Sequence, residues 1–231
     1  MKVAVVRFPG SNCDLDAVQA LRTIPGMEAD LVWHEDQGMA GYDAVVVPGG
    51  FSFGDYLRAG AIAARSPALK QITRMADDGV PVLGICNGFQ ILVEAGLLPG
   101  ALLRNTTLKF VCKWTNVRVE NTRTPFTRAF KKGQVLRIPI AHSEGRYHLP
   151  EKDLCRLVDE GRIAFRYCDE RGQVDEASNP TGTLDNIAGV CNESGNVLGL
   201  MPHPERATES ILSPVGSSDG RYVFESLLRD D

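Results

Sequence analysis

The stretch Val82-Leu83-Gly84-Ile85-Cys86-Asn87-Gly88-Phe89-Gln90 decides the fold, because it joins a buried strand to a helix through a tight turn. Its first half is a short apolar run, typical of a strand buried on both faces. Its second half has helical character as far as residue 95. Gly84-x-Cys86-x-Gly88 has the form of a nucleophile elbow, with cysteine in place of serine. The two glycines allow a sharp turn and leave room beside Cys86.

On either side of this elbow, apolar runs alternate with helical patterns. Strands are predicted at residues 2–7, 27–33, 42–47 and 80–85, and helices at residues 15–22, 66–77 and 87–95. Asp14 is predicted to cap the first helix, and Pro67 stands in the first turn of the second. This β-α-β-α order predicts an α/β fold with a mostly parallel open sheet and helices on both faces.

The pattern changes after residue 110. Strands separated by turns are predicted at residues 111–119, 135–140, 162–168, 187–192 and 197–201, and a closing helix at 221–228. Such a run of strands suits an antiparallel extension of the parallel sheet. No repeat, low-complexity segment or linker interrupts the chain, so residues 1–231 are predicted to form a single domain.

Composition excludes several classes of function. The 231 residues carry a formal net charge of −4 and no basic stripe, which argues against nucleic-acid binding. No apolar run approaches the ~18 residues that cross a membrane, and the N-terminal run is too short for a signal peptide, so a cytoplasmic protein is expected. The six cysteines and four histidines show no zinc spacing, so no metal site is expected. No phosphate loop of the G-x-x-x-x-G-K-[ST] form occurs.

Cys86 is the predicted nucleophile. At the start of a helix, the dipole and the free N–H groups favour the thiolate. A histidine beside it would favour the thiolate further and would shuttle a proton. The N–H group of Asn87 is placed to stabilise an oxyanion. A buried structural cysteine in a tight turn is the alternative, and this motif alone does not decide between the two.

A second motif, Met201-Pro202-His203-Pro204-Glu205, follows a predicted strand. Its two prolines exclude a regular helix. In an extended stretch, residues i and i+2 project to the same side, so His203 and Glu205 are predicted to lie together. A carboxylate that orients an imidazole is what a thiol nucleophile needs. The alternative is a stiffened loop with exposed polar side chains.

A third motif, Pro48-Gly49-Gly50-Phe51, also follows a strand. The backbone N–H groups of its glycine-rich turn are candidates for the other half of an oxyanion hole. Gln90, one turn along the helix after Cys86, is a candidate for lining the substrate pocket, although a helix-surface role fits equally well.

Together, the three motifs resemble those of the class I (triad) glutamine amidotransferases, in the same order and roles. A narrower resemblance covers nearly the whole chain and points to the glutaminase subunits of phosphoribosylformylglycinamidine synthase. It is carried by residues 7–14 (RFPGSNCD), 49–63 (GGFSFGDYLRAGAIA), 141–147 (AHSEGRY), 185–192 (DNIAGVCN) and 202–207 (PHPERA). Two departures are Phe53, where the family usually has tyrosine, and a slightly longer segment at residues 213–220.

The resemblance implies a flavodoxin-like fold and a division of labour. This chain would hydrolyse L-glutamine to glutamate and ammonia through a thioester on Cys86, with His203 moving protons and Glu205 holding His203. A large ATP-dependent synthetase subunit, joined by a small bridging subunit, would use the ammonia to convert formylglycinamide ribonucleotide to formylglycinamidine ribonucleotide in purine biosynthesis. ATP and magnesium would belong to that partner, and this chain would need no cofactor.

By the same resemblance, a polar turn lies close to the active site. It comprises His142, Ser143, Glu144 and Arg146. A solvated turn is the bland alternative for it. Three other functions remain open for the chain: a class I glutaminase that serves another synthetase, a redox or chaperone protein similar to ThiJ/PfpI, and an inactive scaffold that only binds the synthetase.

Overall fold

A computed structural model describes residues 1–36 and 38–228. Its centre is a nine-stranded sheet in the order β2-β1-β3-β4-β11-β10-β9-β6-β7. The strands are β1 (Lys2–Arg7), β2 (Glu28–Trp33), β3 (Ala44–Val47), β4 (Val82–Ile85), β6 (Val111–Val119), β7 (Val135–His142), β9 (Ile163–Cys168), β10 (Ile187–Cys191) and β11 (Val197–Leu200). A separate antiparallel pair contains β5 (Ala101–Leu103) and β8 (Arg146–His148). The mixed α/β fold agrees with the prediction.

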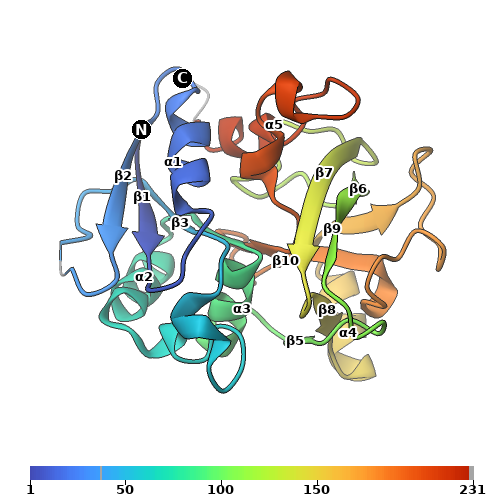
Figure 1. Cartoon of the computed structure of the whole chain (residues 1–231), viewed down its shortest axis with the longest axis horizontal. Helices are drawn as coiled ribbons and strands as arrows, with labels where there is room; N and C mark the ends of the chain where they lie inside the picture. Colours follow the sequence, from blue (N-terminus) through green and yellow to red (C-terminus); the bar gives the residue numbers. More distant parts are fainter. Residues whose placement is uncertain (37, 229–231) are drawn as a thin grey trace.

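The strands from β2 to β11 along the sheet are parallel, and those from β11 to β7 are antiparallel. In Figure 1 the parallel strands β1 and β2 lie on the left, and β6, β7 and β9 lie on the right. β11 was expected in the antiparallel extension, but it pairs in parallel with β4, Val197 opposite Val82. The chain therefore returns to the middle of the sheet after building the extension.

Five α-helices accompany the sheet among the described residues: α1 (Asp14–Arg22), α2 (Pro67–Asp77), α3 (Asn87–Glu94), α4 (Glu151–Asp159) and α5 (Arg221–Glu225). Ser66 caps α2 by accepting a hydrogen bond from the N–H group of Leu69. Asp14 is not a cap: Cys13 is at the N-cap position of α1, and the Asp14 carboxylate accepts a hydrogen bond from Nε of Arg7. The helix gains a partly buried ion pair in place of a cap.

Among the strands and α-helices, three were not predicted, namely β5, β8 and α4. The two strands have only three residues each, too few for a periodic pattern to show. α4 is amphipathic, with Leu157 as its buried residue. In the other direction, the closing helix α5 ends at Glu225 rather than at residue 228.

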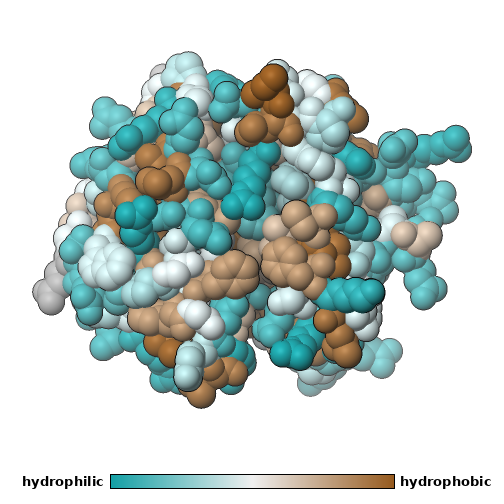
Figure 2. Space-filling model, in the orientation of Figure 1, coloured by the Kyte–Doolittle hydropathy of each residue, from teal (hydrophilic) through white to brown (hydrophobic). Residues whose placement is uncertain are grey.

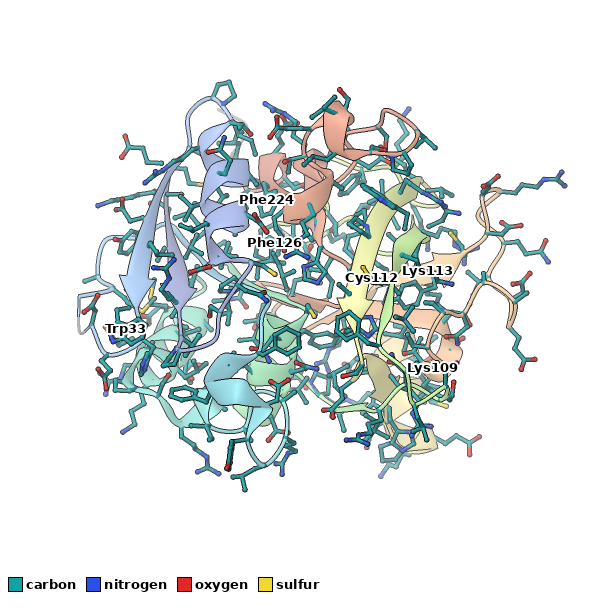
Figure 3. All side chains as sticks on the ribbon, viewed as in Figure 1. Trp33, Lys109, Cys112, Lys113, Phe126 and Phe224 are labelled. Atoms are coloured by element: carbon teal, nitrogen blue, oxygen red, sulfur yellow. The ribbon has the colours of Figure 1, made fainter. Side chains whose placement is uncertain are left out.

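The core is mostly aliphatic, with buried aromatic side chains contributed by distant segments of the chain. Phe126 and Phe224 are both fully buried, and Figure 3 labels both well inside the outline of the molecule. α1 packs on β1 and β2, whereas α3 packs on β3, β4 and β11. In the part of the chain that the structure describes, no helix is long and apolar enough to cross a membrane. The packing of α3 on three parallel strands is what places Cys86 at the centre of the sheet edge.

Candidate active site

Cys86 lies between β4 and α3 in a strained backbone conformation, with φ of 50° and ψ of −105°. A non-glycine residue with positive φ is uncommon and clusters at functional sites. A Cβ atom on Gly88 would lie 1.9 Å from the carbonyl oxygen of Val47, and one on Gly84 would lie 2.5 Å from Leu92. The glycines at both positions are therefore required for α3 to approach the sheet, whereas the turn itself is made by the positive φ of Cys86.

His203 and Glu205 lie together at the end of β11, the strand next to β4. Nδ1 of His203 and Oε1 of Glu205 are 2.7 Å apart, and both residues are buried. The N–H group of His203 donates to the carbonyl oxygen of Pro139 on β7 (2.8 Å). The expected proximity is present, but it comes from a 3-10 turn, η4 (Pro204–Ala207), rather than from an extended stretch.

The electrostatics of this pair favour a protonated imidazole. Burial opposes a charge on His203, but the carboxylate of Glu205 and the sulfur of Cys86 outweigh it, so the pKa of His203 lies well above its ordinary value. Nε2 of His203 and Oε2 of Glu205 have no hydrogen-bond partner among the described residues. A ring that is fixed at Nδ1 and unpartnered at Nε2 can pass a proton to another group.

Cys86 and His203 open on the same small cavity of about 90 Å³, the volume of roughly three water molecules. The other side chains and backbone that line it belong to Asn12, Cys13, Gly50, Phe51, Phe110, Ala141 and Arg206. The half-exposed rings of Phe51 and Phe110 lie with their centroids 6.5 Å apart. On the face drawn in Figure 2, hydrophobic side chains form separate patches among hydrophilic ones.

Comparison with known proteins shows to which family this chain is related. The sequence model of one protein family, the CobB/CobQ-like glutamine amidotransferase domain, matches residues 1–226. The chain belongs to this glutamine amidotransferase family. It is 57% identical to the phosphoribosylformylglycinamidine synthase subunit PurQ of Aquifex aeolicus over 100% of both chains. It is 56% identical to the PurQ subunit of Methanosarcina acetivorans, with 98% of this chain and 97% of that one aligned.

A solved structure supports the similarity of this amidotransferase to PurQ subunits. The structure of PurLQS from Thermotoga maritima contains a chain that matches with a TM-score of 0.85 and 47% identity, covering 98% of this chain and 96% of that one. The family match and the fold together argue against the ThiJ/PfpI-like alternative. The resemblance inferred from the motifs is confirmed.

The predicted oxyanion donors differ in whether their backbone N–H groups are free to bind an oxyanion. The N–H group of Phe51 already donates to the carbonyl oxygen of Gly10 (2.9 Å). In residues 1–36 and 38–228, no acceptor is found for the N–H group of Gly50. The N–H group of Asn87, at the first position of α3, has no partner within the helix. Gly50 and Asn87 are therefore the better candidates, while Gly49 packs against His203.

Gln90 does not line the cavity but joins three segments. Its Oε1 accepts from Nδ2 of Asn87 (3.0 Å), and its Nε2 donates to the carbonyl oxygen of Glu144 (2.7 Å). Oδ1 of Asn87 in turn accepts from the N–H group of Ser52 (3.1 Å). The elbow helix is thus tied both to the segment after Gly50 and to the polar turn after β7.

The polar turn lies beside the site, although none of its four candidate side chains lines the cavity. His142 is buried, and burial together with His203 lowers its pKa to about 3, so the ring is neutral. Ser143 is exposed, and Glu144 forms an ion pair with Arg104. Arg146 lies on β8. Their neighbour Ala141 makes the closest approach, because its carbonyl oxygen is 3.8 Å from Sγ of Cys86.

Cys13 and Arg206 were not assigned to the site from the sequence. Ligand atoms of Cys13, His203 and Glu205 lie within 4.8 Å of one another, a thiol, imidazole and carboxylate set that could hold a metal. However, Nη2 of Arg206 donates to Sγ of Cys13 (3.1 Å), and this guanidinium charge would repel a cation. Hydrogen bonds within the protein account for the cluster without a metal.

Proposed function

We propose that this chain is the glutaminase subunit of a phosphoribosylformylglycinamidine synthase, an amide-forming ligase of purine biosynthesis. The observation that carries the glutaminase activity is Cys86, strained at an elbow, sharing a cavity with the hydrogen-bonded His203–Glu205 pair. The choice of acceptor is supported by full-length similarity to PurQ subunits.

In the first half of the reaction, Sγ of Cys86 attacks the side-chain carbonyl carbon of glutamine. The N–H groups of Gly50 and Asn87 stabilise the oxyanion that forms. Protonated His203 then donates its proton to the leaving nitrogen, the carbon–nitrogen bond breaks, and ammonia departs. A thioester between Cys86 and the glutamyl group remains.

In the second half, water attacks the thioester carbon, and His203 accepts a proton from this water. The carbon–sulfur bond breaks, glutamate leaves, and Cys86 and His203 return to their starting states. Glu205 stabilises the imidazolium in both halves, since its carboxylate lies 2.7 Å from Nδ1. The sum is glutamine plus water giving glutamate plus ammonia.

The ammonia is consumed by a large synthetase subunit, which binds ATP and magnesium, and a small third subunit bridges the two. The relative from Thermotoga maritima, whose structure is a PurLQS complex, supports the first of these partners. This chain works without a cofactor of its own, as one domain spanning residues 1–231. The cytoplasm is the proposed compartment because all six cysteines are free.

The test is synthesis by the complex of this chain with its synthetase. Cys86→Ala is expected to abolish glutamine-dependent synthesis and to leave ammonia-dependent synthesis intact. Cys155→Ala, at an exposed cysteine on α4, is the matched control and should retain both activities. Equal loss of both activities in Cys86→Ala would indicate a scaffold instead of a glutaminase.

A second arm of this test concerns the acceptor. The chain is mixed separately with synthetases of different acceptors, and glutamine-dependent product is measured for each. Product with the purine synthetase alone supports the proposal. Product only with another synthetase would leave the glutaminase activity intact and refute the purine assignment.

A further inference from the structure

The loop between β1 and α1, residues 8–13, has no part in these steps, yet it brings a second thiol to His203. Cys13 is 2% exposed, and its sulfur lies within 4.8 Å of the ligand atoms of His203 and Glu205. The N–H group of Cys13 donates to the carbonyl oxygen of Gly49 (3.2 Å), which ties the loop to the oxyanion segment. Two thiols, Cys13 and Cys86, therefore interact with one imidazole.

Two further polar groups hold the sulfur of Cys13 in place. Sγ donates to Oδ1 of Asn12 (3.1 Å) and accepts from Nη2 of Arg206 (3.1 Å). Nε of Arg206 donates to Oδ2 of Asp16 on α1 (3.2 Å). The contacts run from α1 through Arg206 and Cys13 to the imidazole. A network of this kind restricts each of its members, because moving one leaves the others unpaired.

Close packing confines the imidazole from another side. A Cβ atom on Gly49 would lie 2.8 Å from Cε1 of His203 and 3.1 Å from Sγ of Cys13. The ring and the sulfur both rest against this bare stretch of backbone. With Glu205 at Nδ1, the ring has little freedom to rotate away from Cys86.

We infer that Cys13, supported by Arg206, is a positioning residue that holds the imidazole of His203 in the orientation needed for proton transfer at Cys86. The inference rests on the proposed glutaminase function. Cys13 does not itself attack glutamine. Its backbone is unstrained, with φ of −105° and ψ of 9°, and its thiol is engaged on both sides. Burial also raises the pKa of the Cys13 thiol, which keeps it protonated.

The groups that face His203 come from four elements. They are Glu205 and Arg206 on η4, Cys13 before α1, Cys86 before α3, and His142 on β7. Glu205 makes the largest favourable contribution to the imidazolium, and the nearby sulfur of Cys13 adds a smaller one. Loss of the Cys13 sulfur should therefore lower the pKa of His203 as well as loosen the ring.

The experiment compares Cys13→Ala, Cys13→Ser and the control Cys155→Ala in the complex with the synthetase. Cys13→Ala is expected to lower kcat by about 3- to 10-fold, the effect of one ordinary hydrogen bond, with little change in KM for glutamine. The alkaline limb of the pH–rate profile should move down by about 0.5 to 1 pH unit. Cys13→Ser, which keeps a hydrogen-bonding group, should restore both.

Arg206→Met provides a second variant if Cys13→Ala does not fold, and it should lower kcat with little change in KM, because Cys13 loses the guanidinium that holds its sulfur. A wild-type kcat in Arg206→Met or a wild-type pH profile in Cys13→Ala would overturn the inference, as would labelling of Cys13 instead of Cys86 by a diazoketone analogue of glutamine. Failure of the proposed function looks different, because Cys86→Ala would then either keep its glutamine-dependent activity or lose the glutamine-dependent and ammonia-dependent activities equally.

Discussion

Replacing Glu205 by Gln tests the electrostatic role of the His203–Glu205 pair. The amide keeps a hydrogen-bonding oxygen near Nδ1 but removes the negative charge, which lies 2.7 Å away by its nearest atom. Two unit charges about 4 Å apart interact by about 4 kcal/mol at an effective dielectric constant of about 20. Since one pKa unit corresponds to about 1.4 kcal/mol, the pKa of His203 should fall by as much as about 3 units.

The raised pKa of His203 in the wild type determines which limb of the activity profile moves. The pKa of His203 is raised, so the imidazolium persists at low pH and is lost as the pH rises through the folded-state value. In Glu205→Gln this loss should occur at lower pH, and the alkaline limb of the activity profile should move in the acidic direction. The stability that the charged pair contributes below the unfolded-state pKa of His203 should be lost in the variant as well.

The assay is the rate at which a diazoketone analogue of glutamine inactivates the protein, measured from pH 6 to pH 10, alongside glutamine-dependent synthesis by the complex. Glu209→Gln, an exposed carboxylate four residues further along the chain, is the matched control and should retain the wild-type profile. An alkaline limb that stays in place in Glu205→Gln would refute the reasoning, because the charge would then not govern His203.

Three further predictions follow from local contacts. Gly88→Ala should reduce the free energy of unfolding by at least about 2 kcal/mol in urea titrations, because its Cβ would meet the carbonyl oxygen of Val47. Gln90→Ala should raise KM for glutamine about 3- to 10-fold in steady-state kinetics, since the link to Glu144 is lost. Asp55→Asn should raise Tm at pH 8 but not at pH 4. Burial and then Glu144 raise the pKa of Asp55 to about 6, so the protein loses stability as the pH rises through this value and the carboxyl ionises, and the neutral amide avoids that loss.

Local patterns were sufficient to predict most of the sheet. The buried strands β1, β3 and β4 are runs of apolar residues, and the antiparallel strand β6 was predicted with its observed ends. The partner of β11 was not predictable in the same way, because strand pairing depends on contacts between distant parts of the chain. The short strands and α4 were missed because their patterns are brief or weak.

In the site too, residues in compact motifs were predicted, whereas residues brought together by contacts between distant segments were not. Cys86 and the His203–Glu205 pair stand in compact motifs, so their residue types and spacing predicted them. Cys13 and Arg206 were missed as site residues, because their contact exists only once the N-terminal loop meets the segment after β11. Their one signal was the presence of both in the stretches that carry the family resemblance.

The pairing of β4 with β11 also bears on how the enzyme is made. Val82 lies opposite Val197, so the strand that delivers the nucleophile pairs with β3 first and must wait for its second partner, β11, which is synthesised more than a hundred residues later. Closing so long a loop is slow compared with forming local structure. During translation, Cys86 leaves the ribosome well before His203 exists. We therefore expect Cys86 in nascent chains to lack its partner His203. Glutamine hydrolysis should begin only after β11 enters the sheet.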